Sequence, residues 1–392
     1  MRVLPFVVLG AIFLAGAEAA KKEDTKKDKA VAAAPKTGAE TPVVQGAPLP
    51  GDWPVSDQKV KPKPEWLKQV DFSKLPNAPV SSAKGPQCKE GQDQFCAWTC
   101  TGCTRNDTDV VKCPKKGDWG LTFDDGPTPF SPKLYDYLNS INQKATLFVI
   151  GSRVKEYPDL LRRAYKDGHQ IASHTWSHSM MTSLSNEEIV AELKWTEEAI
   201  KAAINVTVRY FRPPYGDIDD RVRGIAKQLG YKIIIWNHDT DDWRMAEEKG
   251  FDPNWIDGNF TQWEKDAPNM TEGSISLEHD LYAGTVDAAI RNIPGLKKAF
   301  NVIPVAQCLA DQYPYAEKDI VYNPAGGNAT ASASAQIPVS SAPASSASII
   351  PSTSKVDAGA IESGKPSKVS SGSGVVKPVL GAISMIIAFA LI

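Results

Sequence analysis

Residues 121–127 read Leu-Thr-Phe-Asp-Asp-Gly-Pro, an apolar run that leads into two adjacent aspartates and a turn. A run with so little polar alternation is typical of a strand buried on both faces. Asp-Gly-Pro is ordinary turn chemistry, so a plain turn is the simplest interpretation of Asp124 and Asp125. Neighbouring carboxylates repel each other unless a cation lies near them, however. The stretch therefore predicts a buried strand with functional carboxylates at its end.

Six further apolar runs follow the first, at 145–150, 169–173, 206–211, 231–236, 274–277 and 302–305. Helical patterns separate several of them. The clearest is 185–204, where Ser185 and Glu188 form a capping box, and a second spans 157–167. About seven strands alternating with helices predict an α/β fold. Periodicity leaves open whether the sheet is a barrel or doubly wound.

Polar residues follow five of these runs. They are Asp124 and Asp125 after the first, His174 after the third, Arg212 after the fourth, 239–242 after the fifth and His279 after the sixth. In α/β folds, the carboxyl ends of strands carry the functional site. We therefore expect these side chains to meet in one place.

The pair His174 and His178 has the spacing that places two imidazoles on one face of a helical turn, where both can bind one metal. Two packed or exposed histidines are the commoner meaning of such a pair. A carboxylate from another strand end would complete a His₂-carboxylate set that leaves positions open for water. Of Asp124 and Asp125, one would then bind the metal and the other would take a proton.

Three more motifs each have a plain alternative. Residues 211–216, Phe-Arg-Pro-Pro-Tyr-Gly, form either a stiff turn whose amide stabilises an oxyanion or an ordinary loop. Residues 239–243, Asp-Thr-Asp-Asp-Trp, are either part of the site or a solvated acidic loop. Residues 277–280, Leu-Glu-His-Asp, are either part of the site or a surface strand end.

Taken in order, these motifs resemble those of the polysaccharide deacetylases of carbohydrate esterase family 4, the NodB-homology family. The resemblance covers about residues 117–310 and implies a distorted (β/α) barrel of about seven strands. It implies a divalent metal, usually zinc with cobalt as a second candidate, bound by Asp125, His174 and His178. The catalytic residues that it implies are Asp124 as base, His279 as acid, Arg212 orienting the base and Asp242 supporting the acid, although Asp239 and Asp241 lie close to that last position.

The resemblance further implies that the Tyr215 amide contributes to an oxyanion hole and that Trp243 and Leu277 line an acetyl pocket. Its reaction is hydrolysis of N-acetyl groups. Within the family, the chain ends resemble those of fungal chitin deacetylases, which convert chitin to chitosan and acetate. Two alternatives stay open: a deacetylase of another acetylated glycan, and a non-catalytic chitin-binding protein anchored in the wall.

Composition separates the ends of the chain from its middle. Of 392 residues, 42% are hydrophobic and the formal net charge is −2, which argues against nucleic acid as a partner. Residues 1–19 predict a cleaved secretory signal, and 20–110 a Pro-rich, largely disordered extension that contains a cysteine cluster. A few apolar side chains of this extension could pack on the catalytic domain, 111–310; they are Trp53, Trp66, Leu67 and Phe72.

The other end has the composition of a stalk followed by an anchor signal. Residues 324–376 are rich in Ser, Thr, Ala and Pro, and 377–392 form an apolar tail. Small residues before the tail match a glycolipid (GPI) attachment signal, with Ser370 or Ser371 as the attachment point. The sequence therefore predicts a secreted protein held at the outer face of the membrane, or passed on to the wall.

Cysteines and sequons fit the secretory route. Family resemblance implies a bridge between Cys113 and Cys308, and the four cysteines at 88, 96, 100 and 103 are expected to form structural disulfides of open connectivity. Residues 244–272 are a long connection whose Trp255 and Trp263 either stack on sugar rings or form a local hydrophobic cluster. N-glycans are expected at the five sequons, Asn106, Asn205, Asn259, Asn269 and Asn328.

Overall fold

The computed structural model describes residues 46–86, 88 and 93–322. The predicted signal (1–19), stalk (324–376), anchor tail (377–392) and sequon Asn328 lie outside the described residues. So do Ser370 and Ser371. Within the described part, no helix has both the length and the apolar character needed to cross a membrane.

The strands are β1 Asp109–Val110, β2 Asp118–Gly120, β3 Thr122–Asp124, β4 Thr146–Val149, β5 Gln170–Ser173, β6 Tyr210–Phe211, β7 Lys232–Ile234, β8 His238–Asp239, β9 Ser274–Leu277 and β10 Asn301–Ile303. The helices are α1 Pro64–Leu67, α2 Trp98–Thr101, α3 Ser131–Ser140, α4 Gly151–Glu156, α5 Pro158–Lys166, α6 Asn186–Ile204, α7 Asp220–Gln228, α8 Arg244–Glu247, α9 Asn254–Asp266, α10 Ala283–Ala299 and α11 Val305–Cys308. Three 3₁₀ turns accompany them: η1 Phe72–Lys74, η2 Met181–Ser183 and η3 Pro214–Gly216.

The strands form a distorted barrel. One sheet has the order β1-β7-β6-β5-β4-β3 and the other β10-β2-β9-β8, and neighbouring strands in both are parallel. Leu121 alone separates β2 from β3, and residues 235–237 separate β7 from β8, so the same two chain segments run through both sheets. A parallel β-bridge between Asp124 and His279 adds a backbone contact at the carboxyl ends of β3 and β9. Because the two sheets share these segments, the strands close on themselves, as the barrel prediction requires.

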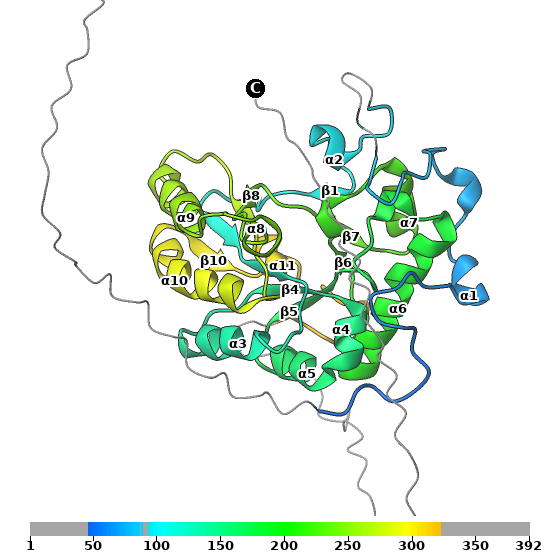
Figure 1. The fold of residues 1–392 in the computed structure, drawn as a ribbon, viewed down its shortest axis with the longest axis horizontal. Coiled ribbons are helices and arrows are strands. Elements are labelled where there is room, and N and C mark those ends of the chain that lie inside the picture. The colour runs from blue at the N-terminus through cyan, green and yellow to red at the C-terminus, as the bar shows by residue number, and fades with distance from the viewer. Residues whose placement is uncertain (1–45, 87, 89–92, 323–392) are drawn as a thin grey trace, which may run out of the picture. The chain divides into compact units, whose positions relative to one another are not determined.

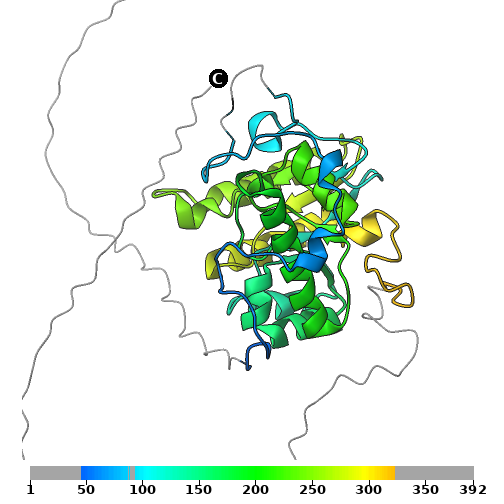
Figure 2. The same cartoon turned by 90° about the vertical axis from the view of Figure 1, so that its right-hand side faces the viewer.

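Each of the seven predicted runs overlaps a strand, although β10 begins one residue before its run, and helices surround the strands (Figures 1 and 2). Helix α6 begins after Ser185, whose hydroxyl accepts from the Glu188 amide while the Glu188 carboxylate accepts from the Ser185 amide; the predicted capping box is confirmed. Helix α5 begins at Pro158, within the helix predicted for 157–167, and proline is well suited to this first helical position. The sequence did not predict β1, β2 and β8, because these short segments contain polar residues or glycine and lie outside the apolar runs.

The expectation of a largely disordered extension is wrong for residues 46–86. They pack against α4 and α6, with Trp66 4% exposed and its ring 5.0 Å from that of Trp195 at 84°. Trp53, Leu67 and Phe72 also pack on the core, as predicted. The segment has little secondary structure, but large aromatic side chains bury enough surface to attach it.

The connection 244–272 is not one loop, since α8 and α9 occupy much of it. Its two tryptophans differ. Trp263 packs on Trp119 (ring centroids 5.4 Å apart), which fits the local cluster, whereas Trp255 is 53% exposed. The sequon Asn259 lies within α9, and its side-chain nitrogen donates to the Thr240 carbonyl (3.2 Å), so the atom that would carry a glycan is engaged.

Three disulfides link the six cysteines. Cys113–Cys308 joins the start of the barrel to its end, which confirms that prediction. The other two are Cys88–Cys100 and Cys96–Cys103, so the expectation of structural disulfides is also confirmed.

Loop closure makes a quantitative prediction for two of these bridges. Cys113–Cys308 spans 195 residues and Cys96–Cys103 spans 7. Paired serine substitution should lower the free energy of unfolding by about 5 kcal/mol at Cys113/Cys308 and about 2 kcal/mol at Cys96/Cys103, because the longer loop restricts the unfolded chain more. Denaturant unfolding measures both values. Equal losses, or a larger loss at Cys96/Cys103, would contradict this account.

Candidate active site

Asp125, His174 and His178 form a cluster able to hold a metal ion. Their ligand atoms all lie within 4.8 Å of one another. The Nε2 atoms of His174 and His178 lie 3.5 and 3.2 Å from Asp125 Oδ1. That oxygen is buried and accepts no hydrogen bond from the described residues, a costly state that a cation would relieve. The donor set therefore fits a divalent metal.

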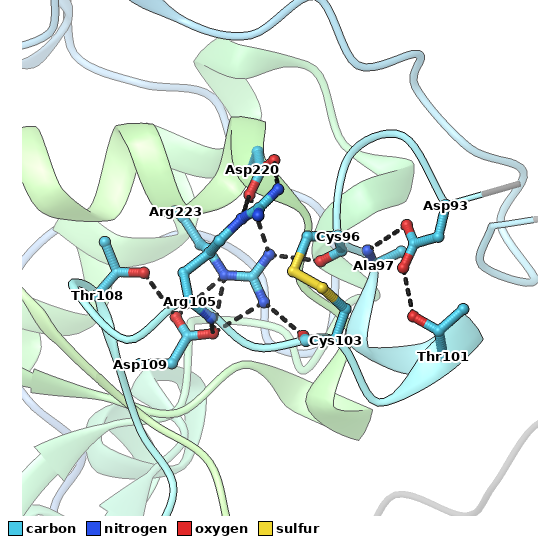
Figure 3. The surroundings of a disulfide bond; sticks show 10 residues. All are labelled: Asp93, Cys96, Ala97, Thr101, Cys103, Arg105, Thr108, Asp109, Asp220 and Arg223. Atoms are coloured by element: carbon cyan, nitrogen blue, oxygen red, sulfur yellow. Dashed lines mark hydrogen bonds and ion pairs between the residues drawn. A yellow bond between two sulfur atoms is a disulfide. The ribbon is translucent and has the colours of Figure 1, made fainter.

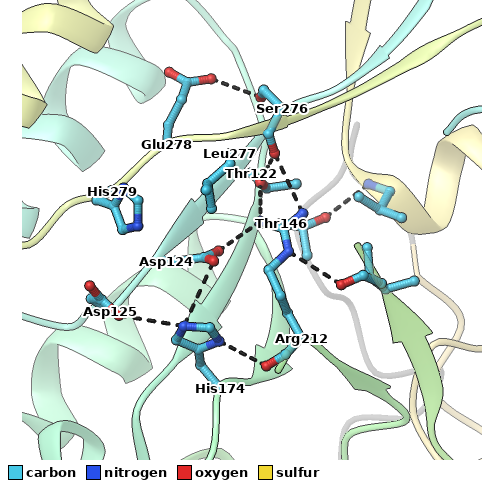
Figure 4. Close-up of polar contacts among 12 residues, drawn as sticks. Thr122, Asp124, Asp125, Thr146, His174, Arg212, Ser276, Leu277, Glu278 and His279 are labelled. Carbon is cyan, nitrogen blue, oxygen red and sulfur yellow. Dashed lines mark hydrogen bonds and ion pairs between the residues drawn. The ribbon is translucent and has the colours of Figure 1, made fainter. Parts of the chain in front are cut away.

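His174 is prepared as a ligand by its surroundings. Its Nδ1 lies 2.9 Å from the Arg212 carbonyl oxygen, so Nδ1–H donates and the Nε2 lone pair faces the cluster (Figure 4). Burial lowers the pKa of His174 to about 3, which keeps the ring neutral at pH 7. Burial also lowers the pKa of His178. Both imidazoles are thus in the protonation state that metal binding needs.

Arg212 is fully buried beside the other aspartate. Its Nη1 donates to Asp124 Oδ1 (2.9 Å) and to Thr122 Oγ1 (2.7 Å). Asp124 Oδ2 then lies on the cluster side, 3.8 Å from His174 Nε2. Burial raises the pKa of Asp124 to about 6, with Arg212 acting in the opposite direction. This carboxylate therefore has one oxygen held and a proton affinity suited to proton transfer near neutral pH.

His279 lies next to Asp124, at the end of β9, and is oriented by Asp242. Its Nδ1 is 2.6 Å from Asp242 Oδ1, and its backbone amide donates to Asp242 Oδ2 (2.8 Å). Burial lowers the pKa of His279, but Asp242, together with Asp125 and Asp124, outweighs burial and raises that pKa to about 10. Asp239 instead accepts from the Asp241 amide, so Asp242 alone of the three carboxylates pairs with this histidine.

The remaining predicted residues border this centre. The Tyr215 ring lies 4.6 Å from the His178 ring and is half exposed. Trp243 is 37% exposed just before α8, whereas Leu277 is buried at the end of β9. The Leu277 carbonyl accepts from Thr240 Oγ1 (2.8 Å), which joins the acidic loop to this strand.

The turns of the site have unusual backbone conformations. Left-handed φ angles occur at five of its non-glycine residues: Asp125 (77°), Thr175 (67°), His178 (55°), Tyr215 (60°) and Asp241 (61°). Each such conformation costs of order 1–3 kcal/mol and persists only where surrounding contacts hold it. The residues that pack around these turns and hold their conformation are therefore part of the site.

Sequence reasoning missed Glu192, which supports the histidine turn from α6. Its Oε2 accepts from the amides of Trp176 and Ser177 (both 2.8 Å), and its Oε1 accepts from Ser177 Oγ (2.7 Å). A signal was available, since Glu192 is a charged residue on the apolar face that carries Ile189 and Leu193. Thr122, which also escaped notice, stands within the first motif.

Within the part of the chain that the structure describes, a parallel barrel carries one Asp/His/His cluster near its strand ends, which places the protein in the class of α/β-barrel proteins with a candidate metal centre. The family model for polysaccharide deacetylase matches residues 111–234. Chitin deacetylase 1 of Cryptococcus neoformans is 44% identical over 274 residues, covering 64% of this chain and 58% of that protein. Chitin deacetylase 1 of Saccharomyces cerevisiae is 35% identical over 270 residues, covering 64% of this chain and 84% of that protein. The chain belongs to the polysaccharide deacetylase family.

This chain covers different shares of the length of its relatives. The chain spans 58% of the Cryptococcus neoformans protein and 62% of the chitin deacetylase of Amylomyces rouxii, which is 42% identical. Among solved structures, the chitin deacetylase of Colletotrichum lindemuthianum is 29% identical, with a TM-score of 0.49 and coverage of 56% of this chain and 97% of that one.

The cluster predicts one tight site for a divalent cation. Removing one ligand with His178→Ala should weaken Zn²⁺ or Co²⁺ binding at least about 100-fold. Isothermal titration of the metal-free protein measures this directly. His238→Ala is the control, because that imidazole lies between Trp119 and Trp263, away from the cluster, and its loss should leave affinity unchanged. Equal affinity in the His178 variant would remove this cluster as the metal site.

Proposed function

We propose that this protein is a metal-dependent chitin deacetylase, which hydrolyses the N-acetyl groups of chitin to give chitosan and acetate. The observation that carries the proposal is one pair of oriented groups beside the metal cluster. Asp124 is held by Arg212, and His279 is held by Asp242. The identities with named chitin deacetylases support the choice of substrate.

Asp124 is proposed as the general base. Arg212 fixes Oδ1, which leaves Oδ2 to accept a proton from a water on the cluster side. With its pKa raised to about 6 by burial, Asp124 is a stronger base than an exposed aspartate and is still ionised at neutral pH. Asp125, one residue later, is free for the different task of binding the cation together with His174 and His178.

His279 is proposed as the general acid. An amide leaves as an amine only after its nitrogen receives a proton. A histidine whose pKa is raised to about 10 by the carboxylates around it, Asp242 foremost, is protonated at pH 7, so it has that proton to donate. Asp242 positions the ring through Nδ1, which leaves Nε2 as the donating atom.

The other predicted residues have binding roles in this proposal. When bound, a divalent cation, zinc or alternatively cobalt, supplies Lewis acidity that polarises a carbonyl oxygen and acidifies water. The Tyr215 amide stabilises the negative charge that develops on the acetyl oxygen, and its turn is already fixed before substrate arrives. Trp243 and Leu277 contact the acetyl methyl group.

We propose that the enzyme acts at the cell surface. Residues 1–19 direct secretion, 324–376 form a stalk, and the tail after Ser370 or Ser371 is replaced by a GPI anchor. The three disulfides suit an oxidising compartment. Of the described sequons, Asn106, Asn205 and Asn269 are exposed and suit N-glycosylation.

Acetate release from chitin oligomers tests the reaction. The chain stripped with a chelator should be inactive, and Zn²⁺ or Co²⁺ should restore activity. Asp124→Asn should lower kcat about 1,000-fold while metal affinity is retained, because only the base is lost. Asp136→Asn, an exposed site on α3, is the control with unchanged rate. Metal binding without acetate release would point to another acetylated glycan or to a non-catalytic chitin-binding protein.

Asp242→Asn should change the pH profile as well as the rate. The acid must be protonated, so activity declines as pH rises through the pKa of His279. Loss of the carboxylate lowers that pKa, and the alkaline decline should therefore begin about 1–3 pH units lower. The profile of kcat against pH measures the shift. An unshifted alkaline limb with a uniformly lower rate would show that Asp242 does not act through the protonation of His279.

A further inference from the structure

A small disulfide-bonded segment precedes the family domain and lies against the site. It comprises residues 93–103, includes α2, and is closed by Cys96–Cys103; we refer to it as the knob (Figure 3). Asp93 accepts from the Ala97 amide (2.7 Å) and from the Thr101 hydroxyl, which fixes the knob internally. The matched family domain begins only at residue 111, so nothing in that match assigns the knob a role.

Arg223 of α7 attaches the disulfide-linked ends of the knob to the barrel. This side chain is 2% exposed, and its guanidinium donates to the carbonyls of Cys96 (2.5 Å) and Cys103 (3.0 Å). The same guanidinium pairs with Asp109 of β1 at 2.9 Å (Figure 3). Both ends of the disulfide loop are therefore held by one buried cation that is also bound to a strand.

Trp98, in helix α2 of the knob, packs against the turn that carries Tyr215. Its amide donates to the Ile218 carbonyl (3.0 Å), and its ring fills the space beside Gly216, where a Cβ atom would lie 2.4 Å from Trp98 Cε3. The next residue, Thr99, donates from its hydroxyl to Asp217 Oδ1 (3.2 Å). The knob thus contacts the residues on the C-terminal side of Tyr215.

Trp98 also contacts Trp236, whose ring packs near the Arg212 guanidinium. Its centroid lies 4.7 Å from that of Trp236, and the Trp236 ring lies 5.5 Å from the guanidinium carbon of Arg212. Trp236 therefore lies between Trp98 and the arginine that orients Asp124.

The turn needs such support because two consecutive residues are left-handed. Tyr215 has φ 60° and Gly216 φ 66°. A tyrosine held in this region is strained, and surrounding packing must maintain it. We propose that the knob is an integral part of the active site and that Trp98 is a positioning residue, which holds the Tyr215 amide where the acetyl oxygen develops charge. The catalytic half of this proposal rests on the proposed function.

Two variants of the full chain test Trp98. Trp98→Ala should lower kcat for acetate release about tenfold or more, because a misplaced oxyanion donor loses its effect, whereas KM and Zn²⁺ affinity should stay within about twofold. Trp98→Phe keeps a ring against Gly216 and should restore most of the rate. Hydrogen exchange of residues 210–218 should be faster in Trp98→Ala than in the parent, with or without substrate.

The disulfides provide a matched control. Paired serines at Cys96 and Cys103 should reproduce the loss of kcat with a modest loss of stability. Paired serines at Cys113 and Cys308 should give the opposite result, a larger loss of stability with kcat of the folded protein within twofold. Both are measured at a temperature where circular dichroism shows the variants folded.

Each outcome supports or overturns the proposal. A raised KM with unchanged kcat would make Trp98 a substrate contact, and unchanged kcat and KM would leave it no role; either overturns the proposal. If the parent chain releases no acetate, the proposed function fails on its own. In that case, hydrogen exchange tests separately whether the knob holds the turn. Equal exchange of residues 210–218 in Trp98→Ala and in the parent would overturn this structural part of the proposal.

Discussion

The buried guanidinium of Arg212 is the constraint on which the rest of the site depends. An unpaired charge at this depth would cost several kcal/mol, so its partners must be in place. They come from separate strands: Thr122 and Asp124 from β3 and the Ser276 carbonyl from β9. The backbone carbonyl of Arg212 also fixes the tautomer of His174. One residue thereby contacts both sheets and fixes the orientation of Asp124 and of the His174 ring.

Neighbouring groups acquire different chemistry because the fold gives them different partners. Asp124 and Asp125 are adjacent in sequence, yet one faces a guanidinium and the other two imidazoles. As a result, burial raises the pKa of Asp124, whereas the pKa of Asp125 is lowered despite its burial, with protonated His279 and Arg153 among the charges that act on it. His174 and His279 differ in the same way, since burial keeps one neutral and a carboxylate keeps the other protonated. In the proposed function, such separation lets one small site bind a cation and transfer protons in two directions.

Segments outside the matched domain complete the supporting shell. Trp176 lies between His174 and His178 in sequence; Trp53 stacks on it with centroids 6.2 Å apart, and Trp176 Nε1 donates to the Val55 carbonyl (3.1 Å). Glu192 holds the same turn by accepting from the Trp176 and Ser177 amides. The strained backbone of the site is therefore held by contacts from the extension and from α6, in the way that functional strain generally requires.

The sequence by itself determined the α/β class, the seven strand-forming runs, the capped helix at Ser185 and the polar residues at strand ends, because hydrophobic period and capping are local properties of the chain. Family motifs then implied the barrel and the residues of the site. Tertiary structure decided what no local pattern encodes. A barrel strand and a strand of an open sheet have the same period, so closure became visible only in the shared segments. The attachment of residues 46–86 and the contact of Trp98 with Gly216 join residues far apart in sequence, and only packing in three dimensions selects them. The four clustered cysteines are close in sequence, but their spacing allows more than one pairing, and the folded backbone selects Cys88–Cys100 and Cys96–Cys103.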